Sequence, residues 1–125
     1  MKGSSHKHDL SFLIGRDLDC ICIEHGQLQL LFHAPVSNLR GVGIAVQSRV
    51  IHQGKSGTME WDCNKPVTAF CSLLMLLRAP LARVTGLPDG TLKLQFANDE
   101  SVTILTSARN EHSYQVWDGD AVTVF

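Results

Sequence analysis

The sequence lacks several features that would point to a specific class of protein. Its 125 residues include 11 basic and 12 acidic side chains, for a formal net charge of −1. A protein that binds nucleic acid through phosphate contacts needs a strongly basic face, so this balance argues against a nucleic-acid partner. The longest apolar run, Ala69 to Leu77, is interrupted by Ser72 and is far shorter than the roughly 20 residues that cross a bilayer. Met1 to Asp9 is polar and lacks the apolar core of a secretory signal, so we expect a cytoplasmic protein with no membrane contact.

Motifs for catalysis and cofactor binding are also missing. There is no G-x-S-x-G elbow and no catalytic-cysteine signature, and residues 53–58 contain Gly, Lys and Ser without the glycine spacing of a phosphate-binding loop. Glu111, His112 and Tyr114 form the most chemically varied cluster, in which a general acid or base is an alternative. A carboxylate beside a histidine in a loop that leads into a strand is usually polar surface, however. We therefore predict no enzymatic activity and no cofactor.

Four cysteines and six histidines raise the question of a metal site. Cys20 and Cys22 are two positions apart in a strand-like run, so their side chains share a face, but the paired C-x-x-C knuckles of a zinc site are missing. Cys71 falls within an apolar stripe, and the histidines show neither helical nor knuckle spacing, whereas zinc usually needs three or four converging ligands. We expect reduced, structural thiols and no metal; a thiolate metal site and disulfides are the alternatives.

The clearest local pattern in the chain lies between Leu87 and Leu105. Leu92, Leu94 and Phe96 alternate with polar residues, which is typical of a strand with one wet face. Turn residues precede and follow this run, so an antiparallel hairpin is predicted from residues 91–96 and 101–105. Further strands are expected at Leu10–Ile14, Leu18–Ile23, Leu28–His33, Ser113–Trp117 and Ala121–Phe125, with one bent strand or two short ones between Val36 and His52.

One helix is predicted, between Asn64 and Leu77. Asn64 is a suitable N-cap, Pro66 falls in the first turn, and Pro80 lies just past the end. A single apolar stripe supports the helix: Val67, Phe70, Cys71, Leu74 and Leu77. The predicted fold class is therefore α+β, with a curved or split antiparallel β-sheet of about six to nine strands and one principal helix packed on it. We expect residues 1–9 to be a flexible N-terminus and residues 10–125 to form a single α+β domain.

Acidic residues dominate the last third of the chain. From residue 89 onward there are six acids, Asp89, Asp99, Glu100, Glu111, Asp118 and Asp120, against the two bases Lys93 and Arg109. Trp117 stands beside Asp118, and aromatic residues rimmed by charge are typical anchors of protein interfaces. The alternative is that Trp61 and Trp117 fill the core.

The motifs of residues 61–125 resemble those of a small bacterial family of unknown function. In order they are Trp61, Leu76-Leu77, Val84, Asp89-Gly90, Leu92-Lys-Leu-Gln-Phe96, Asn98-Asp99, Val102 to Leu105, and Glu111-His-Ser-Tyr114. Leu13-Ile-Gly15 and the strands after it fit more loosely. Two positions depart from the family pattern, since Arg78 and Glu100 stand where glycine is expected.

Proteins similar to this family include immunity proteins of contact-dependent growth inhibition and related toxin systems, each of which neutralises a cognate toxin domain. The resemblance implies such a role here. Many of these toxins are basic nucleases, and an acidic inhibitor associates rapidly with a basic partner. The predicted toxin-binding residues are Asp99, Glu100, Glu111, Tyr114, Trp117, Asp118 and Asp120. One alternative is a small-ligand-binding β-rich protein with His33 or His112 at the mouth of an apolar pocket, and another is a structural homodimer that pairs through the helix stripe.

Overall fold

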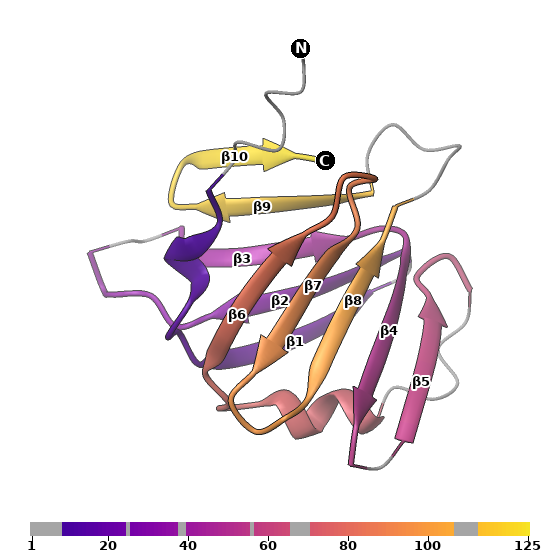
Figure 1. Ribbon diagram of the computed structural model, residues 1–125. Helices are drawn as coiled ribbons and strands as arrows, with labels where there is room; N and C mark the ends of the chain where they lie inside the picture. The colour runs from indigo at the N-terminus through magenta and orange to yellow at the C-terminus, as the bar shows by residue number, and fades with distance from the viewer. Residues whose placement is uncertain (1–8, 25, 38–39, 56, 66–70, 107–112) are drawn as a thin grey trace.

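Two five-stranded antiparallel sheets make up the fold. The structure is a computed structural model that describes residues 9–24, 26–37, 40–55, 57–65, 71–106 and 113–125. Sheet 1 has the strand order β1-β2-β3-β9-β10, and sheet 2 has the order β5-β4-β8-β7-β6. In Figure 1 the strands of sheet 1 run across the view, and those of sheet 2 rise steeply in front of them. The two sheets therefore face each other as the layers of a sandwich, with their strands crossing.

The strands are short, with four to seven residues each. Those of sheet 1 are β1 (Leu18–Glu24), β2 (Gln27–Phe32), β3 (Val42–Val46), β9 (Tyr114–Asp118) and β10 (Ala121–Val124). Those of sheet 2 are β4 (Arg49–Gly54), β5 (Gly57–Asp62), β6 (Leu81–Gly86), β7 (Leu92–Phe96) and β8 (Ser101–Leu105). The described residues also form the 3-10 helices η2 (Ser11–Leu13) and η3 (Cys71–Leu76).

The core lies between the two sheets and follows from the alternation of apolar side chains along each strand. Leu28, Leu30 and Phe32 of β2 are buried, and so are Leu92, Leu94 and Phe96 of β7. Phe32 and Phe96 stack with ring centroids 6.5 Å apart and planes 8° apart, which joins the two sheets directly. Each sheet buries the apolar face that would otherwise be in water, and this burial is the main stabilising contribution to the sandwich.

The two hairpins predicted in the second half of the chain are confirmed. Residues 92–96 and 101–105 pair as β7 and β8, and residues 114–118 and 121–124 pair as β9 and β10. The two hairpins lie in different sheets, however, because β9 pairs with β3 and β8 pairs with β4. The strands predicted at Leu18–Ile23 and Leu28–His33 are also confirmed as β1 and β2, with ends that differ by one residue.

The predicted α+β fold class is wrong, because the fold is nearly all β and has no principal helix in the part of the chain that the structure describes. Of the predicted helix Asn64–Leu77, residues 66–70 lie outside the described residues, and residues 71–76 form the short 3-10 helix η3. Leu73 and Leu76 are buried, a spacing of three that suits the 3-10 period, while Leu74 and Met75 are exposed. η3 ends at Leu76, and two residues later Arg78 has a φ of 68°, outside the helical region.

The N-terminal half differs from the expectations in one element and contains one strand that was not predicted. Leu10–Ile14 does not form a strand but contains η2, which buries Leu13 completely. For the segment Val36–His52, the alternative of two short strands is confirmed, as β3 and the start of β4, which belong to different sheets. The strand β5 was not predicted, although Met59 and Trp61 alternate with the polar residues Thr58, Glu60 and Asp62. Among the described residues, no helix has the length and apolar character that crossing a membrane requires.

Candidate functional site

The predicted toxin-binding residues lie in two distant parts of the fold. Asp99 and Glu100 belong to the β7–β8 connection of sheet 2, whereas Trp117, Asp118 and Asp120 belong to the β9–β10 hairpin of sheet 1. Figure 1 shows the β7–β8 connection at the lower end of the molecule and the β9–β10 hairpin at the upper end. Tyr114 starts β9, and Glu111 lies outside the described residues. The seven residues therefore do not form one patch.

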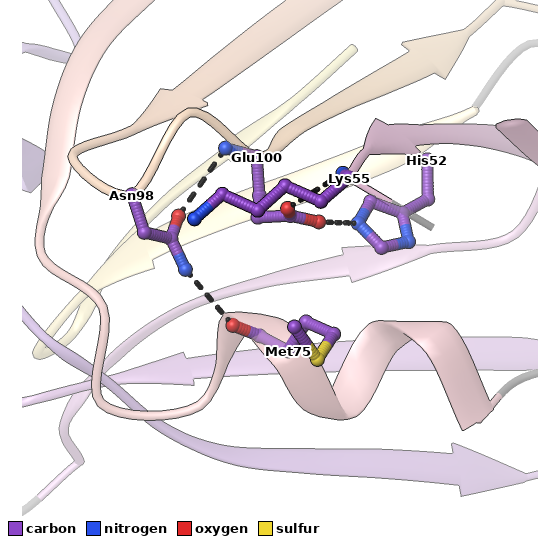
Figure 2. Close-up of polar contacts among 5 residues, drawn as sticks. All are labelled: His52, Lys55, Met75, Asn98 and Glu100. Carbon is purple, nitrogen blue, oxygen red and sulfur yellow. Dashed lines mark hydrogen bonds and ion pairs between the residues drawn. The ribbon is translucent and has the colours of Figure 1, made fainter. Parts of the chain in front are cut away.

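Glu100 is buried rather than presented to a partner. Its side chain and that of His52 are each 1% exposed, and His52 Nε2 lies 2.7 Å from Glu100 Oε1. The second carboxylate oxygen accepts a hydrogen bond of 3.1 Å from the backbone N–H of Lys55 (Figure 2). These donors, the Lys55 N–H foremost and His52 next, hold the pKa of Glu100 below its ordinary value against the opposing effect of burial. Glu100 is therefore an ionised acceptor for two donors inside the protein.

The glycine at position 54 makes room for this carboxylate. A Cβ atom at Gly54 would overlap the carboxylate of Glu100, so only glycine fits beside it. On the other side, the backbone N–H of Glu100 donates to Asn98 Oδ1, and Asn98 Nδ2 donates to the carbonyl oxygen of Met75 (Figure 2). The hydrogen bonds of Glu100 and Asn98 therefore connect the β4–β5 and β7–β8 turns to each other and to η3.

Chemistry at the His52–Glu100 pair would require access that the fold does not give. A histidine hydrogen-bonded to a carboxylate is a common arrangement for proton transfer, but it acts only where a substrate can reach it. Both side chains are closed off from solvent. The pair therefore has a structural role.

Tyr114 is the second predicted residue that faces the interior. It is 3% exposed, and its hydroxyl donates a hydrogen bond of 2.8 Å to the carbonyl oxygen of Gly90. Its ring stacks on Phe125 with centroids 4.6 Å apart. Burial, with a smaller contribution from the charge of Asp89, raises the pKa of Tyr114 to about 12. Tyr114 thus connects sheet 1 to the turn that precedes β7 and has almost no surface for a partner.

The alternation of positions along the strands would have indicated that Glu100 and Tyr114 are buried, although Asp118, at the end of β9, shares the position of Tyr114 in the alternation and is exposed. Glu100 is two positions before Val102, and Tyr114 is two before Val116, so each lies on the core face of its strand. His52 is likewise two positions after the buried Val50, a signal that the sequence reading missed.

Trp117 has the opposite parity and lies on the outer face of sheet 1. It pairs with Gly43 on one side and with Val122 on the other. The indole covers Gly43 so closely that a Cβ atom there would lie 2.5 Å from Trp117 Cζ2. Its Nε1 donates a hydrogen bond of 3.2 Å to the carbonyl oxygen of Arg40. The side chain is half-buried and fixed in orientation, with part of the ring open to solvent.

Two exposed valines continue this face onto the last strand. Val122 is 56% exposed and Val124 is 44% exposed, and their register places them on the same face as Trp117. We call Gly43, Trp117, Val122 and Val124 the corner surface. It is apolar, and its centre is a tryptophan held over a glycine.

Charged residues border the corner surface at the β9–β10 turn. Asp120 forms an ion pair of 2.6 Å with Arg40 Nε, and the two side chains are 87% and 75% exposed. Such an exposed pair adds little to stability, typically about 0–1 kcal/mol, because water and salt screen it. Asp118 is exposed at the end of β9. Three of the predicted residues, Trp117, Asp118 and Asp120, therefore lie together at this corner and give it an acidic and aromatic character.

A second group of exposed apolar side chains lies at η3. Leu74 is 54% exposed, Met75 is 49% exposed and Leu77 is 36% exposed. Asp99, with a φ of 68°, is in the neighbouring turn that Asn98 ties to Met75. This group has no aromatic anchor, and it offers a useful control for the corner surface.

Within the described ranges, no three His, Cys, Asp or Glu side chains form a metal-binding group. His33 is 69% exposed and pairs with Asp19 at 3.3 Å, on the exterior rather than at a pocket mouth. Cys63 is buried, and burial raises the pKa of its thiol to about 12. Cys20 and Cys22 are free thiols on β1.

Comparison with known proteins gave no match among family models, curated proteins or solved structures. The resemblance of residues 61–125 to the bacterial family therefore stays a prediction that rests on their motifs alone.

Proposed function

We propose that this protein binds another protein through the corner surface, and that the partner is a bacterial toxin domain which it neutralises as an immunity protein. The observation that carries the binding proposal is Trp117, fixed over Gly43 and flanked by the exposed side chains of Val122 and Val124. The choice of a toxin as the partner comes from the family resemblance. Catalysis is not part of the proposal.

The chemistry of the corner surface suits a protein partner. Tryptophan is the residue type most enriched among binding hot spots, and a pre-oriented aromatic loses little side-chain entropy when it binds. Trp117 is already held by its hydrogen bond to Arg40 and by its contact with Gly43. The charged residues around it then form the polar rim that surrounds the apolar centre of most interfaces.

The last strand adds a second mode of recognition. Within the described part of the chain, β10 pairs with β9 on one side and with no strand on the other. Residues 121–124 contain neither a charged side chain nor proline, the features that commonly protect an edge strand from pairing. An extended segment of the partner can therefore add to β10 by backbone hydrogen bonds while its side chains reach the valines.

The charges at the corner favour a basic partner. Asp118 and Asp120 contribute two negative charges near Trp117, and Arg40 contributes one positive charge. Many toxin nucleases are basic, and opposite charge accelerates association with such a partner. A cytoplasmic location for the complex follows as part of the same proposal.

The experiment is capture of the partner from the source cells with tagged protein, followed by mass spectrometry and then by binding measurements with the purified partner. We expect a toxin fragment in stoichiometric amount, and we expect co-expression of this protein to protect cells from that toxin. Val122→Lys and Trp117→Ala should each weaken binding by about 30-fold or more, the cost of a hot spot of about 2 kcal/mol.

Matched controls lie on other surfaces of the same molecule. Leu87→Lys changes a side chain that is 48% exposed, and Leu74→Lys changes one that is 54% exposed, so neither should affect binding. Capture of a partner without a toxin domain would overturn the immunity role. Equal binding by the Val122→Lys and Leu87→Lys proteins would overturn the corner surface as the binding site.

Two other functions remain as competing outcomes. A homodimer through the corner surface would double the mass in solution, and Val122→Lys would return it to the mass of one chain. A small-ligand binder would show a ligand that co-purifies with the wild-type protein and that the corner variants retain.

A further inference from the structure

The two thiols of β1 form a pair on the outer face of sheet 1. Cys20 and Cys22 are two residues apart on one strand, and their Sγ atoms lie 3.7 Å apart. Cys20 is exposed and Cys22 is half-buried. Residues two apart on a strand point to the same side, so the backbone holds both sulfur atoms in place together.

The separation of the two sulfur atoms fits one kind of ligand. With metal–sulfur bonds of about 2.3 Å, two thiolates on a tetrahedral ion lie about 3.8 Å apart, whereas two thiolates on a linear ion lie about 4.6 Å apart. The observed 3.7 Å matches the tetrahedral arrangement. We propose that Cys20 and Cys22 chelate a thiophilic divalent metal ion of the Zn²⁺ or Cd²⁺ type, as two of its four ligands.

A disulfide between the same residues fits less well. Residues two apart on a strand have Cα atoms about 6.4–6.8 Å apart, at the upper limit of the distances that disulfides span. The sulfur atoms would also have to approach from 3.7 Å to about 2.0 Å. Metal binding needs no such movement, because the observed separation already matches that of two thiolates on a tetrahedral ion.

The surroundings of the pair leave the other two metal positions open. β1 is the first strand of sheet 1, and its neighbours opposite the thiols are Leu31 and Gln29 on β2. Glu24 lies two residues after Cys22, on the same face of β1. A negative charge near the site also attracts a cation. Water or the thiolates of a second copy would complete the coordination.

Binding of the metal ion exchanges protons for the ion. Each thiol loses one proton to solvent as the divalent ion binds, so two metal–sulfur bonds replace two S–H bonds and no oxidant is needed. Affinity should therefore increase with pH as deprotonation becomes easier. Cys63 does not compete for the ion, because it is buried inside the protein.

The test is titration of the full reduced chain with Cd²⁺, followed by thiolate-to-metal charge-transfer absorbance in the ultraviolet. We expect one ion per chain, or one ion per two chains with a doubled mass if a second copy completes the site. Cys20→Ser and Cys22→Ser should each lower the affinity by more than about 100-fold, since the loss of groups that only support a ligand already costs 10–100-fold. Glu24→Gln should retain the stoichiometry.

A second measurement does not depend on the folding of variants. In the wild-type protein, Cd²⁺ should slow the alkylation of Cys20 and Cys22 together, as read by mass spectrometry of the modified peptides, and should leave the modification of the buried Cys63 unchanged. The proposal is overturned if no charge-transfer band develops, if either serine variant binds as tightly as wild type, or if Cd²⁺ protects neither thiol of β1.

Discussion

Replacing Glu100 with alanine should destabilise the protein far more than its position in a turn between two strands suggests. The carboxylate accepts hydrogen bonds from His52 Nε2 and from the Lys55 N–H at 2.7 Å and 3.1 Å. Hydrogen bonds to a charged group contribute about 1.5–3 kcal/mol each, and removing one member of a buried pair costs about 3–5 kcal/mol. We therefore expect Glu100→Ala to lower the free energy of unfolding by about 3–5 kcal/mol.

The assay is equilibrium unfolding in urea, with a matched control in the same turn. Asp99→Asn changes the neighbouring acid, which is exposed, to a residue that tolerates its φ of 68°. That change should cost less than about 0.5 kcal/mol. Glu100→Gln keeps the shape and one acceptor oxygen, so its cost should fall between the other two. A cost below about 1 kcal/mol for Glu100→Ala would refute the reasoning that the buried pair is important to stability.

The same pair makes stability depend on pH in a definite direction. The Lys55 N–H and then His52 hold the pKa of Glu100 in the folded protein below its ordinary value of 4.5. The stabilisation from the ionised form is therefore fully present above about pH 4.5 and is lost as the pH falls through the lower folded value. Glu100→Gln should remove this part of the acid dependence. The reasoning would be wrong if the free energy of unfolding of the Glu100→Gln protein fell as steeply below pH 5 as that of the wild type.

Three other expected outcomes follow from buried contacts. Tyr114 is the only tyrosine, so the ultraviolet absorbance of tyrosine should titrate near its raised pKa of about 12. The stabilisation from the neutral hydroxyl should be lost as the pH rises through that value. A titration midpoint near pH 10 would contradict this prediction. Gly54→Ala should displace the Glu100 carboxylate and lower the free energy of unfolding in urea by at least about 3 kcal/mol. The double variant Gly54→Ala/Glu100→Ala should lose much less than the sum of the two single losses. Gly43→Ala should displace the Trp117 indole, cost about 1–3 kcal/mol, and shift the tryptophan fluorescence.

Part of the architecture could be predicted from sequence because it depends on local pattern. The β7–β8 hairpin combines period-two apolar residues with turn residues at both ends, and the β9–β10 hairpin has Asp118-Gly119 between its strands. In each case the local chemistry and the final fold agree. Which sheet each hairpin joins depends on pairing with β4 and β3, and no local signal carries that information.

The helix and the site show where local patterns mislead. The apolar residues 73–77 fit an α-helical stripe and a 3-10 spacing equally well. The packing of this segment in the folded protein determines that it forms a 3-10 helix. Glu100 and Asp99 are adjacent acids that composition cannot distinguish. Glu100 lies on the core face and accepts hydrogen bonds from two donors in β4 and the turn after it, which only the tertiary structure brings close to it.

The order of strands also bears on how the protein folds. Sheet 2 is built from residues 49–105, one uninterrupted segment, whereas sheet 1 takes β1 to β3 from before that segment and β9 and β10 from after it. Pairing of Val46 with Tyr114 therefore closes a loop that contains a whole sheet. Contacts so distant in sequence form slowly, because the entropy of the loop is lost before they are made. We expect sheet 2 to form first and the corner surface last, so that a chain acquires its proposed binding surface only on completing its fold.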